Sequence, residues 1–282
     1  MRRPDPRPRA GRLRPPLAAA VATTMCLTSA CATSPLGRRQ LVLFPAGEMA
    51  QMGVAAYDQM KQETPLSTDA RSSAYVRCVA DAITAELDGA AAGHTWEVQV
   101  FADDAVNAFA LPGAKIGVYE GLLEVAQNQD QLATVIGHEV AHVLARHSNE
   151  RVSTAYAAET GAQLVAVAAG AATGSSQQEL YAMLGLGAQV GVLLPFGRAQ
   201  ESEADLLGLD LMASAGFDPR QSVPLWHNMD AAAGGERPPD FLSTHPGPAT
   251  RIAQLEGRMP TALELHDAAR AAGKSPRCAP GL

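Results

Sequence analysis

Two histidines and a glutamate interrupt an apolar run at residues 135–147, VIGHEVAHVLARH. His138 and His142 are four residues apart, so on a helix their imidazoles lie on one face, one turn apart. Buried imidazoles and a carboxylate cost free energy unless something pairs with them, and neutral imidazoles are good zinc ligands. Glu139 lies about 100° around the helix, where it can reach a water on the metal as a general base. The spacing therefore predicts a metal site; the alternative is a chance match in a helix that contains histidine.

A catalytic zinc ion usually takes three protein ligands, so one more must come from elsewhere in the chain. The segment ESEAD at residues 201–205 lies in a predicted helix and offers three carboxylates. Glu201 and Asp205 are four apart and share a face, which suits Glu201 as ligand and Asp205 as the acceptor that holds a zinc histidine. We interpret Glu203, on another face, as a solvated helix carboxylate.

Most of the elements that would position these residues are helical. Apolar residues at helical spacing and terminal capping residues predict helices at 47–63, 70–89, around the histidine motif from Asn128, and at 197–216, 218–235 and 261–272. Residues 243–259 are predicted to hold a loop and one further helix. Alternating residues predict strands within 95–104 and 107–123. We therefore expect a predominantly helical α+β fold with one small β-sheet.

Residues 160–196 are very apolar but interrupted by glycines and by SSQQE, so neither half reaches the length of a membrane span. We interpret them as buried helices. A hydrophobic lip touching the bilayer is the second interpretation, and an integral-membrane peptidase is the third.

The first thirty residues hold six arginines and one aspartate, so removing them takes the net charge from −7 to −12. An acidic remainder argues against nucleic acid as a partner, because phosphate binding needs a basic patch. The basic start, the apolar stretch and the small residues before Cys31 predict a signal peptide at 1–30. LTSAC resembles a bacterial lipobox with Cys31 as the lipidated residue, although Thr28 stands where leucine is usual. A plain signal peptide or an uncut anchor are the alternatives.

This interpretation makes residues 31–45 a tether to outer-membrane lipid and residues 46–282 the folded domain. Cys78 and Cys278 then remain as an even pair in an exported chain, which predicts a disulfide from an early helix to the C-terminal tail. Two buried free thiols are the alternative.

Four segments now carry a resemblance to a known family, because NAFALPGAKIGVYEGLL, VIGHEVAHVLARH, ESEAD and THP occur in this order. Together they resemble the M48 family of zinc metallopeptidases, specifically its small periplasmic lipoproteins, over roughly residues 40–270. The resemblance implies a zincin-like peptidase domain in which one Zn²⁺ is held by His138, His142 and Glu201, with Glu139 as base. It also implies an edge strand that holds extended substrate by main-chain hydrogen bonds, at Asn107, Ala108, Phe109, Ala110 and Leu111. Ala114 departs from the family, which usually has a second glycine in this turn.

Two further residues have open roles. In related periplasmic members a histidine at the place of His245 can occupy the open zinc position and keep the enzyme latent; a transition-state donor or a helix-capping loop histidine are the alternatives. Arg251 is either a stabiliser of the developing oxyanion or a surface arginine. We expect Arg198 at most to contact a metal ligand and not the metal. The remaining histidines are assigned to structure or solvent, namely His94, His147, His227 and His266.

The sequence thus predicts an exported zinc endopeptidase on the periplasmic side of the outer membrane, acting on extended segments of misfolded or stalled envelope proteins. The alternative from another functional class is a chaperone-like binding module with a closed, structural zinc site.

Overall fold

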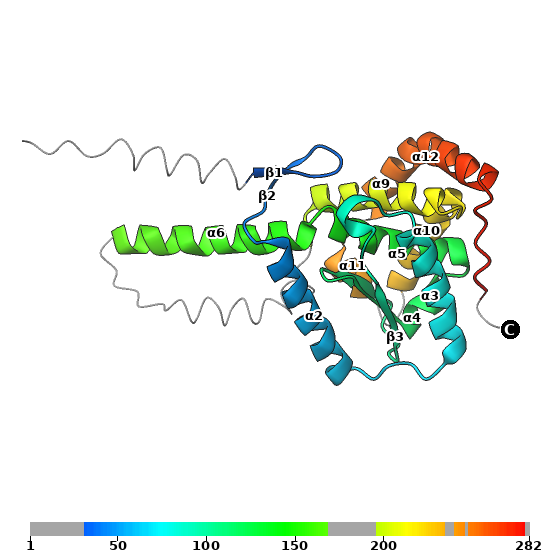
Figure 1. Ribbon diagram of the computed structural model, residues 1–282, viewed down its shortest axis with the longest axis horizontal. Helices are drawn as coiled ribbons and strands as arrows, with labels where there is room; N and C mark the ends of the chain where they lie inside the picture. Colours follow the sequence, from blue (N-terminus) through cyan, green and yellow to red (C-terminus); the bar gives the residue numbers. More distant parts are fainter. Residues whose placement is uncertain (1–30, 169–195, 235–239, 246–247, 280–282) are drawn as a thin grey trace, which may run out of the picture.

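The computed structural model describes residues 31–168, 196–234, 240–245 and 248–279. These residues form a predominantly helical α+β fold, as predicted, with two small sheets where we expected one (Figure 1). The predicted signal peptide and most of the apolar stretch at 160–196 lie outside the described residues. Within the described ranges, no helix combines the length and apolar character needed to cross a membrane.

The larger sheet contains three strands in the order β3 (Glu97–Phe101), β5 (Lys115–Tyr119) and β4 (Ala108–Leu111). β3 runs parallel to β5, whereas β4 pairs antiparallel with β5 and lies at the edge. The turn between β4 and β5 places Gly113 at φ 90° and Ala114 at φ 59°. An alanine in this left-handed region costs roughly 1–2 kcal/mol, so the departure from the family pattern strains the turn without preventing it.

Two helices precede this sheet, α2 (Ala46–Glu63) and α3 (Ala70–Thr84). Asp69 caps α3 by accepting from the backbone N–H groups of the second and third residues, which is the usual role of an aspartate there. α3 ends five residues earlier than the predicted boundary at Gly89, which instead begins a short 3-10 helix with φ 57°. The apolar face of α3 packs against the main core together with strands β3 and β5.

The histidine motif lies on α5 (Gln129–Leu144), which follows the short helix α4 (Glu120–Val125). Asn128 caps α5, its side chain accepting from the N–H groups of Asp130 and Gln131. Every residue from 131 to 142 is buried, so α5 is the central helix of the fold. Its main helical neighbour is α9 (Arg198–Ser214), which carries the ESEAD segment.

The remaining helices flank this central pair. α6 (His147–Ala168) extends away from the rest of the described chain in Figure 1. α10 (Ser222–Ala233) and α11 (Asp240–Thr244) lead to α12 (Pro248–Ala271), a single helix where we expected two. Pro260 lies inside α12 and removes a backbone hydrogen bond. Leu255 and Ala262 are buried on either side of it, so burial of one continuous apolar face keeps the helix whole.

The expected tether at residues 31–45 folds differently. β1 (Cys31–Thr33) and β2 (Arg39–Leu41) pair antiparallel in a hairpin, with Gly37 at φ 86° in the turn. This hairpin is bound to the domain, because Arg38 makes salt bridges to Glu150 of α6 and Glu203 of α9. The half-buried carboxylate of Glu150 and the buried one of Glu203 give this segment fixed partners, which the sequence pattern of residues 31–45 did not reveal.

The tail after α12 is joined to α3 by a disulfide between Cys78 and Cys278, the pairing expected from the sequence. The two cysteines are 200 residues apart, and Cys278 is buried. A bridge that closes so long a loop restricts the unfolded chain strongly.

We expect replacement of both cysteines by alanine to lower the free energy of unfolding by about 2–4 kcal/mol. Urea unfolding followed by circular dichroism measures the change. The wild type in excess reductant serves as the control and should unfold with the double variant. Equal midpoints for the oxidised wild type and the double variant would contradict a stabilising bridge.

Candidate metal centre

The imidazoles of His138 and His142 meet on one face of α5, as their spacing predicts. Their Nε2 atoms are 3.0 Å apart, and both side chains are buried. The Nδ1 atom of His138 lies 3.0 Å from Oδ1 of Asp205 on α9. We assign a proton to this Nδ1, which leaves the Nε2 lone pair free to face the neighbouring imidazole.

Glu201 reaches the same point from α9. Its carboxylate oxygens lie 3.6 Å from Nε2 of His138 and 3.5 Å from Nε2 of His142. A close crossing of the two helices makes this approach possible. A Cβ added at Gly208 would lie 2.6 Å from the backbone nitrogen of His138, and one added at Gly137 would lie 2.8 Å from the carbonyl oxygen of Gly208. Any larger residue at either glycine would force the helices apart.

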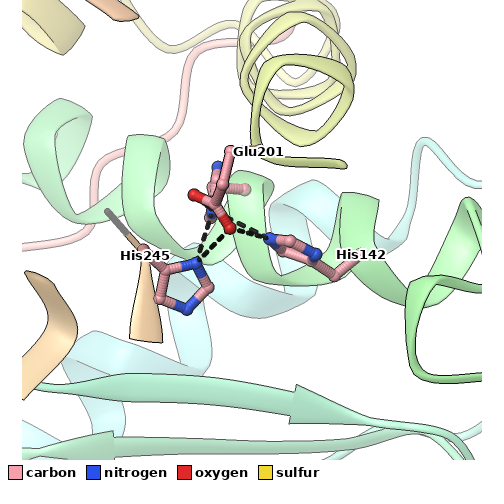
Figure 2. Close-up of side chains that lie close together, drawn as sticks. His142, Glu201 and His245 are labelled. Carbon is pink, nitrogen blue, oxygen red and sulfur yellow. Dashed lines mark hydrogen bonds and ion pairs between the residues drawn. The ribbon is translucent and has the colours of Figure 1, made fainter. Parts of the chain in front are cut away.

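His245 joins the cluster from the segment that follows α11. Figure 2 shows His142, Glu201 and His245 pointing toward one another from three parts of the chain. Nδ1 of His245 lies 2.9 Å from Glu201 Oε1 and 3.2 Å from His138 Nε2. Its ring stacks on Phe241 and Phe196, with centroids 4.3 and 5.1 Å away. The side chain is therefore held in place and is not a solvated loop histidine.

The residues of this cluster fit a divalent metal ion. Ligand donors around a tetrahedral zinc ion, each at about 2.0–2.1 Å, lie roughly 3.3 Å apart, and the measured separations bracket that value. Two imidazole lone pairs 3.0 Å apart repel unless a cation lies between them. Oε2 of Glu201 and Oε1 of Glu139 are buried without a hydrogen bond. Oε2 of Glu201 forms an ion pair with Nη1 of Arg251 at 2.9 Å. Four side chains offer donor atoms within 4.8 Å of one another, namely His138, His142, Glu201 and His245.

The protonation of the cluster also suits a metal. Burial, joined by the charges of His138 and His245, lowers the pKa of His142 well below its usual value. Burial alone would raise the pKa of Glu201, but the hydrogen bond from His245 and the charges of His138, His245 and Arg251 outweigh it and lower that pKa. Near neutral pH, His142 is thus a neutral imidazole and Glu201 a carboxylate, which are the forms that bind metal ions.

Glu139 lies between this cluster and the edge of the sheet. Its Oε2 accepts from the backbone N–H of Ala110 at 3.2 Å, and its Oε1 lies 3.4 Å from Nε2 of His245. Burial raises the pKa of Glu139, and the charges of His245 and His138 only partly oppose the shift. A carboxylate with a raised pKa beside a metal cluster has the affinity for protons that a general base needs.

The free side of β4 faces Glu139. The backbone N–H of Tyr119 donates to the carbonyl of Asn107, and bonded pairs alternate along an antiparallel ladder. Ala108 and Ala110 consequently direct their N–H and C=O groups away from β5. The N–H of Ala110 meets Glu139, and that of Ala108 meets the side chain of Asn107. The predicted substrate strand thus lies beside the predicted base, with both outward amides engaged by side chains of the protein.

Arg251 is not the surface arginine that we considered as an alternative. It is 2% exposed and donates to both oxygens of Asp205, at 2.6 Å each. Its guanidinium also stacks on Trp226, 3.9 Å from the ring centroid. Burial alone would raise the pKa of Asp205, but the charge and hydrogen bonds of Arg251 outweigh it and lower that pKa to about 2. Asp205 stays charged, so it can hold the Nδ1 proton of His138.

Two buried residues lie beside the site where we did not expect them, since we assigned His147 to structure or solvent and Glu203 to solvent. Both are buried, and His147 Nδ1 lies 2.9 Å from Nδ1 of His142. Burial lowers the pKa of His147 to about 4, so it is a neutral imidazole near pH 7. The chain leaves α5 through Arg146 at φ 56°, which breaks the helical spacing and turns His147 back toward His142. Both residues have polar neighbours in the sequence, in RHSNE and ESEAD, so no local pattern indicated that they are buried.

The other polar residues without an assigned role lie away from this cluster. Arg198, His94 and His227 are exposed, and His266 is half-buried beside Asp267. These positions agree with the outer or structural roles expected for them.

The comparisons with known proteins point to one family. Residues 70–259 match the model of peptidase family M48. The chain is 41% identical over 168 residues to the mitochondrial metalloendopeptidase OMA1 of Schizosaccharomyces pombe, covering 59% of this chain and 48% of that protein. It is 32% identical over 242 residues to OMA1 of Danio rerio, covering 81% and 50%. It is 28% identical over 223 residues to the β-barrel assembly-enhancing protease of Escherichia coli K12, covering 75% and 44%. The chain spans about half the length of these relatives.

We expect Arg251→Met to destabilise the metal-free protein by about 3–5 kcal/mol, because it leaves the buried carboxylates of Asp205 and Glu201 without their cation. Urea unfolding in the presence of a chelator measures the loss. Arg258→Met is the matched control on the same helix, since Arg258 pairs with Asp210 at 2.6 Å but its side chain is 34% exposed. That variant should lose about 1 kcal/mol or less. Equal losses in the two variants would show that burial of the Arg251 pair is unimportant.

Proposed function

The chain belongs to peptidase family M48, and from this membership we propose that it is a zinc-dependent endopeptidase that cleaves extended segments of envelope proteins. One observation carries the proposal. His138, His142 and Glu201 converge from two helices, while Glu139 beside them touches the edge strand β4. Metal ligands, a base and a strand that binds peptide are the parts that hydrolysis of an extended peptide requires.

We assign His138 Nε2, His142 Nε2 and a carboxylate oxygen of Glu201 as the ligands of one zinc ion. When bound, zinc supplies polarisation of the scissile carbonyl and acidification of the attacking water. Asp205 holds the Nδ1 proton of His138, and Arg251 keeps Asp205 charged. These contacts fix the direction in which the His138 lone pair points.

Glu139 moves the proton in this proposal. Its carboxylate takes a proton from the attacking water, then delivers it to the nitrogen of the leaving amine. The raised pKa of Glu139 favours the first transfer, since a weakly acidic carboxyl group accepts a proton more readily than an exposed one. Nε2 of His245 lies 3.4 Å from Oε1 of Glu139, the oxygen that does not bind Ala110.

The substrate lies along β4 as an added antiparallel strand, bonded to the outward groups of Ala108 and Ala110. An extended segment would take the Ala110 N–H and release Glu139 from the 3.2 Å hydrogen bond that now holds it. Substrate binding thereby frees the base. Only segments without their own strand partners can bind in this way, which selects unfolded or stalled chains over native ones.

His245 closes the site in the conformation described here. It adds a fourth donor to the three ligands, and four protein donors are typical of closed zinc sites. Its aromatic neighbours, Phe241 and Phe196, stabilise this position. We infer that the resting enzyme is latent and that His245 must leave before substrate is cleaved.

We place the protein in the bacterial periplasm, with Cys31 lipidated and inserted in the outer membrane. The basic and apolar start of the chain and the LTSAC segment support this location. The similarity to a bacterial protease whose name refers to β-barrel assembly supports envelope proteins as substrates. The OMA1 relatives are mitochondrial, so the location depends on the N-terminal residues rather than on similarity.

A chaperone-like binding module with a closed, structural zinc site is the second candidate, and the four-donor cluster favours it. The two candidates differ in what they require of Glu139. A structural site needs its four ligands only, whereas hydrolysis needs the carboxylate of Glu139 as well.

We expect Glu139→Gln to retain zinc but to lose cleavage by roughly 10²–10⁴-fold, because the amide cannot accept the proton. Metal analysis of the purified protein and digestion of unfolded casein measure the two properties. Glu124→Gln, on α4 outside the cluster, is the matched control and should cleave like the wild type. A His245→Ala variant that binds zinc but never cleaves would favour the binding module, since removal of His245 should release a latent peptidase.

We expect His245→Ala to raise casein cleavage by a factor set by the fraction of molecules in the closed conformation. The variant should keep bound zinc, since three ligands remain. Single-turnover cleavage by zinc-loaded wild type and variant makes the comparison. A fall in cleavage with zinc retained would identify His245 as a transition-state donor instead.

A further inference from the structure

We propose that His147 is a positioning residue for the metal ligand His142, anchored from behind by Glu203 and by Arg38 of the N-terminal hairpin. The proposal rests on the proposed function in one respect, because it takes His142 to be a zinc ligand. It gives roles to two buried residues that the hydrolysis described above does not use.

The contact between the two imidazoles has one consistent placement of protons. If His142 offers Nε2 to the metal, its Nδ1 carries the proton and donates to Nδ1 of His147, 2.9 Å away. His147 then carries its own proton on Nε2, which lies 3.2 Å from Oε2 of Glu203. Each donor faces an acceptor, so hydrogen bonds run without a break from the carboxylate of Glu203 through His147 to the metal ligand His142.

His147 and Glu203 do for His142 what Asp205 does for His138. A histidine that binds a metal almost always donates its other N–H to a carboxylate, a carbonyl or a water, which fixes its tautomer and ring orientation. Asp205 accepts from His138, whereas His147 stands at the corresponding nitrogen of His142. Glu203 supplies the carboxylate one residue further out.

The N-terminal hairpin holds Glu203, the last residue of this hydrogen-bond series. Arg38 Nε donates to Glu203 at 3.0 Å, and its two terminal nitrogens donate to both oxygens of Glu150 at 2.6 Å each. The backbone N–H of Leu36 donates to the other oxygen of Glu203 at 3.2 Å. Glu203 therefore has little freedom to rotate away from His147.

The backbone between the two histidines supports a specific role. Arg146 adopts φ 56°, a region that costs a residue with a side chain roughly 1–2 kcal/mol. This conformation starts α6 so that its first residue, His147, packs on His142 with ring centroids 4.9 Å apart. A histidine that only filled space would not need its Nδ1 aimed at the Nδ1 of a ligand.

Two conservative variants separate positioning from packing. The side-chain oxygen of asparagine lies near the place of Nδ1, so His147→Asn keeps the acceptor for His142. His147→Gln keeps a polar group toward Glu203 but has no acceptor at the Nδ1 place. We expect His147→Gln to bind zinc roughly 10- to 100-fold more weakly than the wild type, and His147→Asn to recover most of that loss.

Zinc affinity is measured by competition with a chromophoric chelator, and thermal unfolding of each metal-free protein reports on the fold. Val152→Ala is the matched control, because Val152 is buried on the same helix and 4% exposed. It should lower the unfolding temperature and leave zinc affinity unchanged. Long-range ¹H–¹⁵N spectra of the zinc-loaded protein should show a protected Nδ1 proton on His142 in the wild type and its loss in His147→Gln.

Glu203→Leu is a second test of the positioning role if either His147 variant fails to fold. It changes no group in contact with His142, so we expect a smaller loss of zinc affinity than in His147→Gln. Equal zinc affinity in wild type, His147→Gln and Glu203→Leu would overturn the positioning role and leave the peptidase proposal intact. A wild type that binds no zinc would overturn the proposed function itself.

Discussion

The metal cluster depends on the close crossing of α5 and α9 at Gly137 and Gly208. Neither position has room for a Cβ, so the backbones approach until the carboxylates of α9 lie within reach of the imidazoles on α5. The carboxylate of Glu201 lies 3.6 and 3.5 Å from the two imidazoles, and a wider separation of the helices would move it away from both. Gly137 and Gly208, which have no side chain, thus determine whether the donor residues on α5 and α9 form one site.

Burying the two imidazoles of α5 is tolerable because each has outer partners. Asp205 and Arg251 stand behind His138, and His147 with Glu203 stands behind His142. An unpaired buried charge costs several kcal/mol, and a pair with good geometry recovers much of that cost. The outer residues therefore hold the cluster together before any metal arrives and orient its lone pairs toward a common point.

Much of the fold and the centre of the site follow from local sequence patterns. The helical spacing of His138 and His142 and the four-residue step from Glu201 to Asp205 are periodic signals, as are the strands within 95–104 and 107–123. His147 lies beyond a left-handed residue, so helical periodicity cannot place it. Glu203 is bound by Arg38 of a hairpin 165 residues earlier in the chain, and local patterns cannot predict this long-range contact, which also gives the expected tether a folded structure.

The C-terminal tail is an extended segment carried by a protein that we propose to cut extended segments. Residues 274–279 have no regular structure, yet the chain fixes them at several points. Lys274 pairs with Glu86, Gln129 binds the carbonyl of Pro276 and the N–H of Cys278, and the disulfide closes the end. Loose termini are where proteolysis concentrates. Because the disulfide and Gln129 hold this tail against α3 and α5, we expect it to be a poorer substrate for another molecule of the same enzyme than a loose terminus would be.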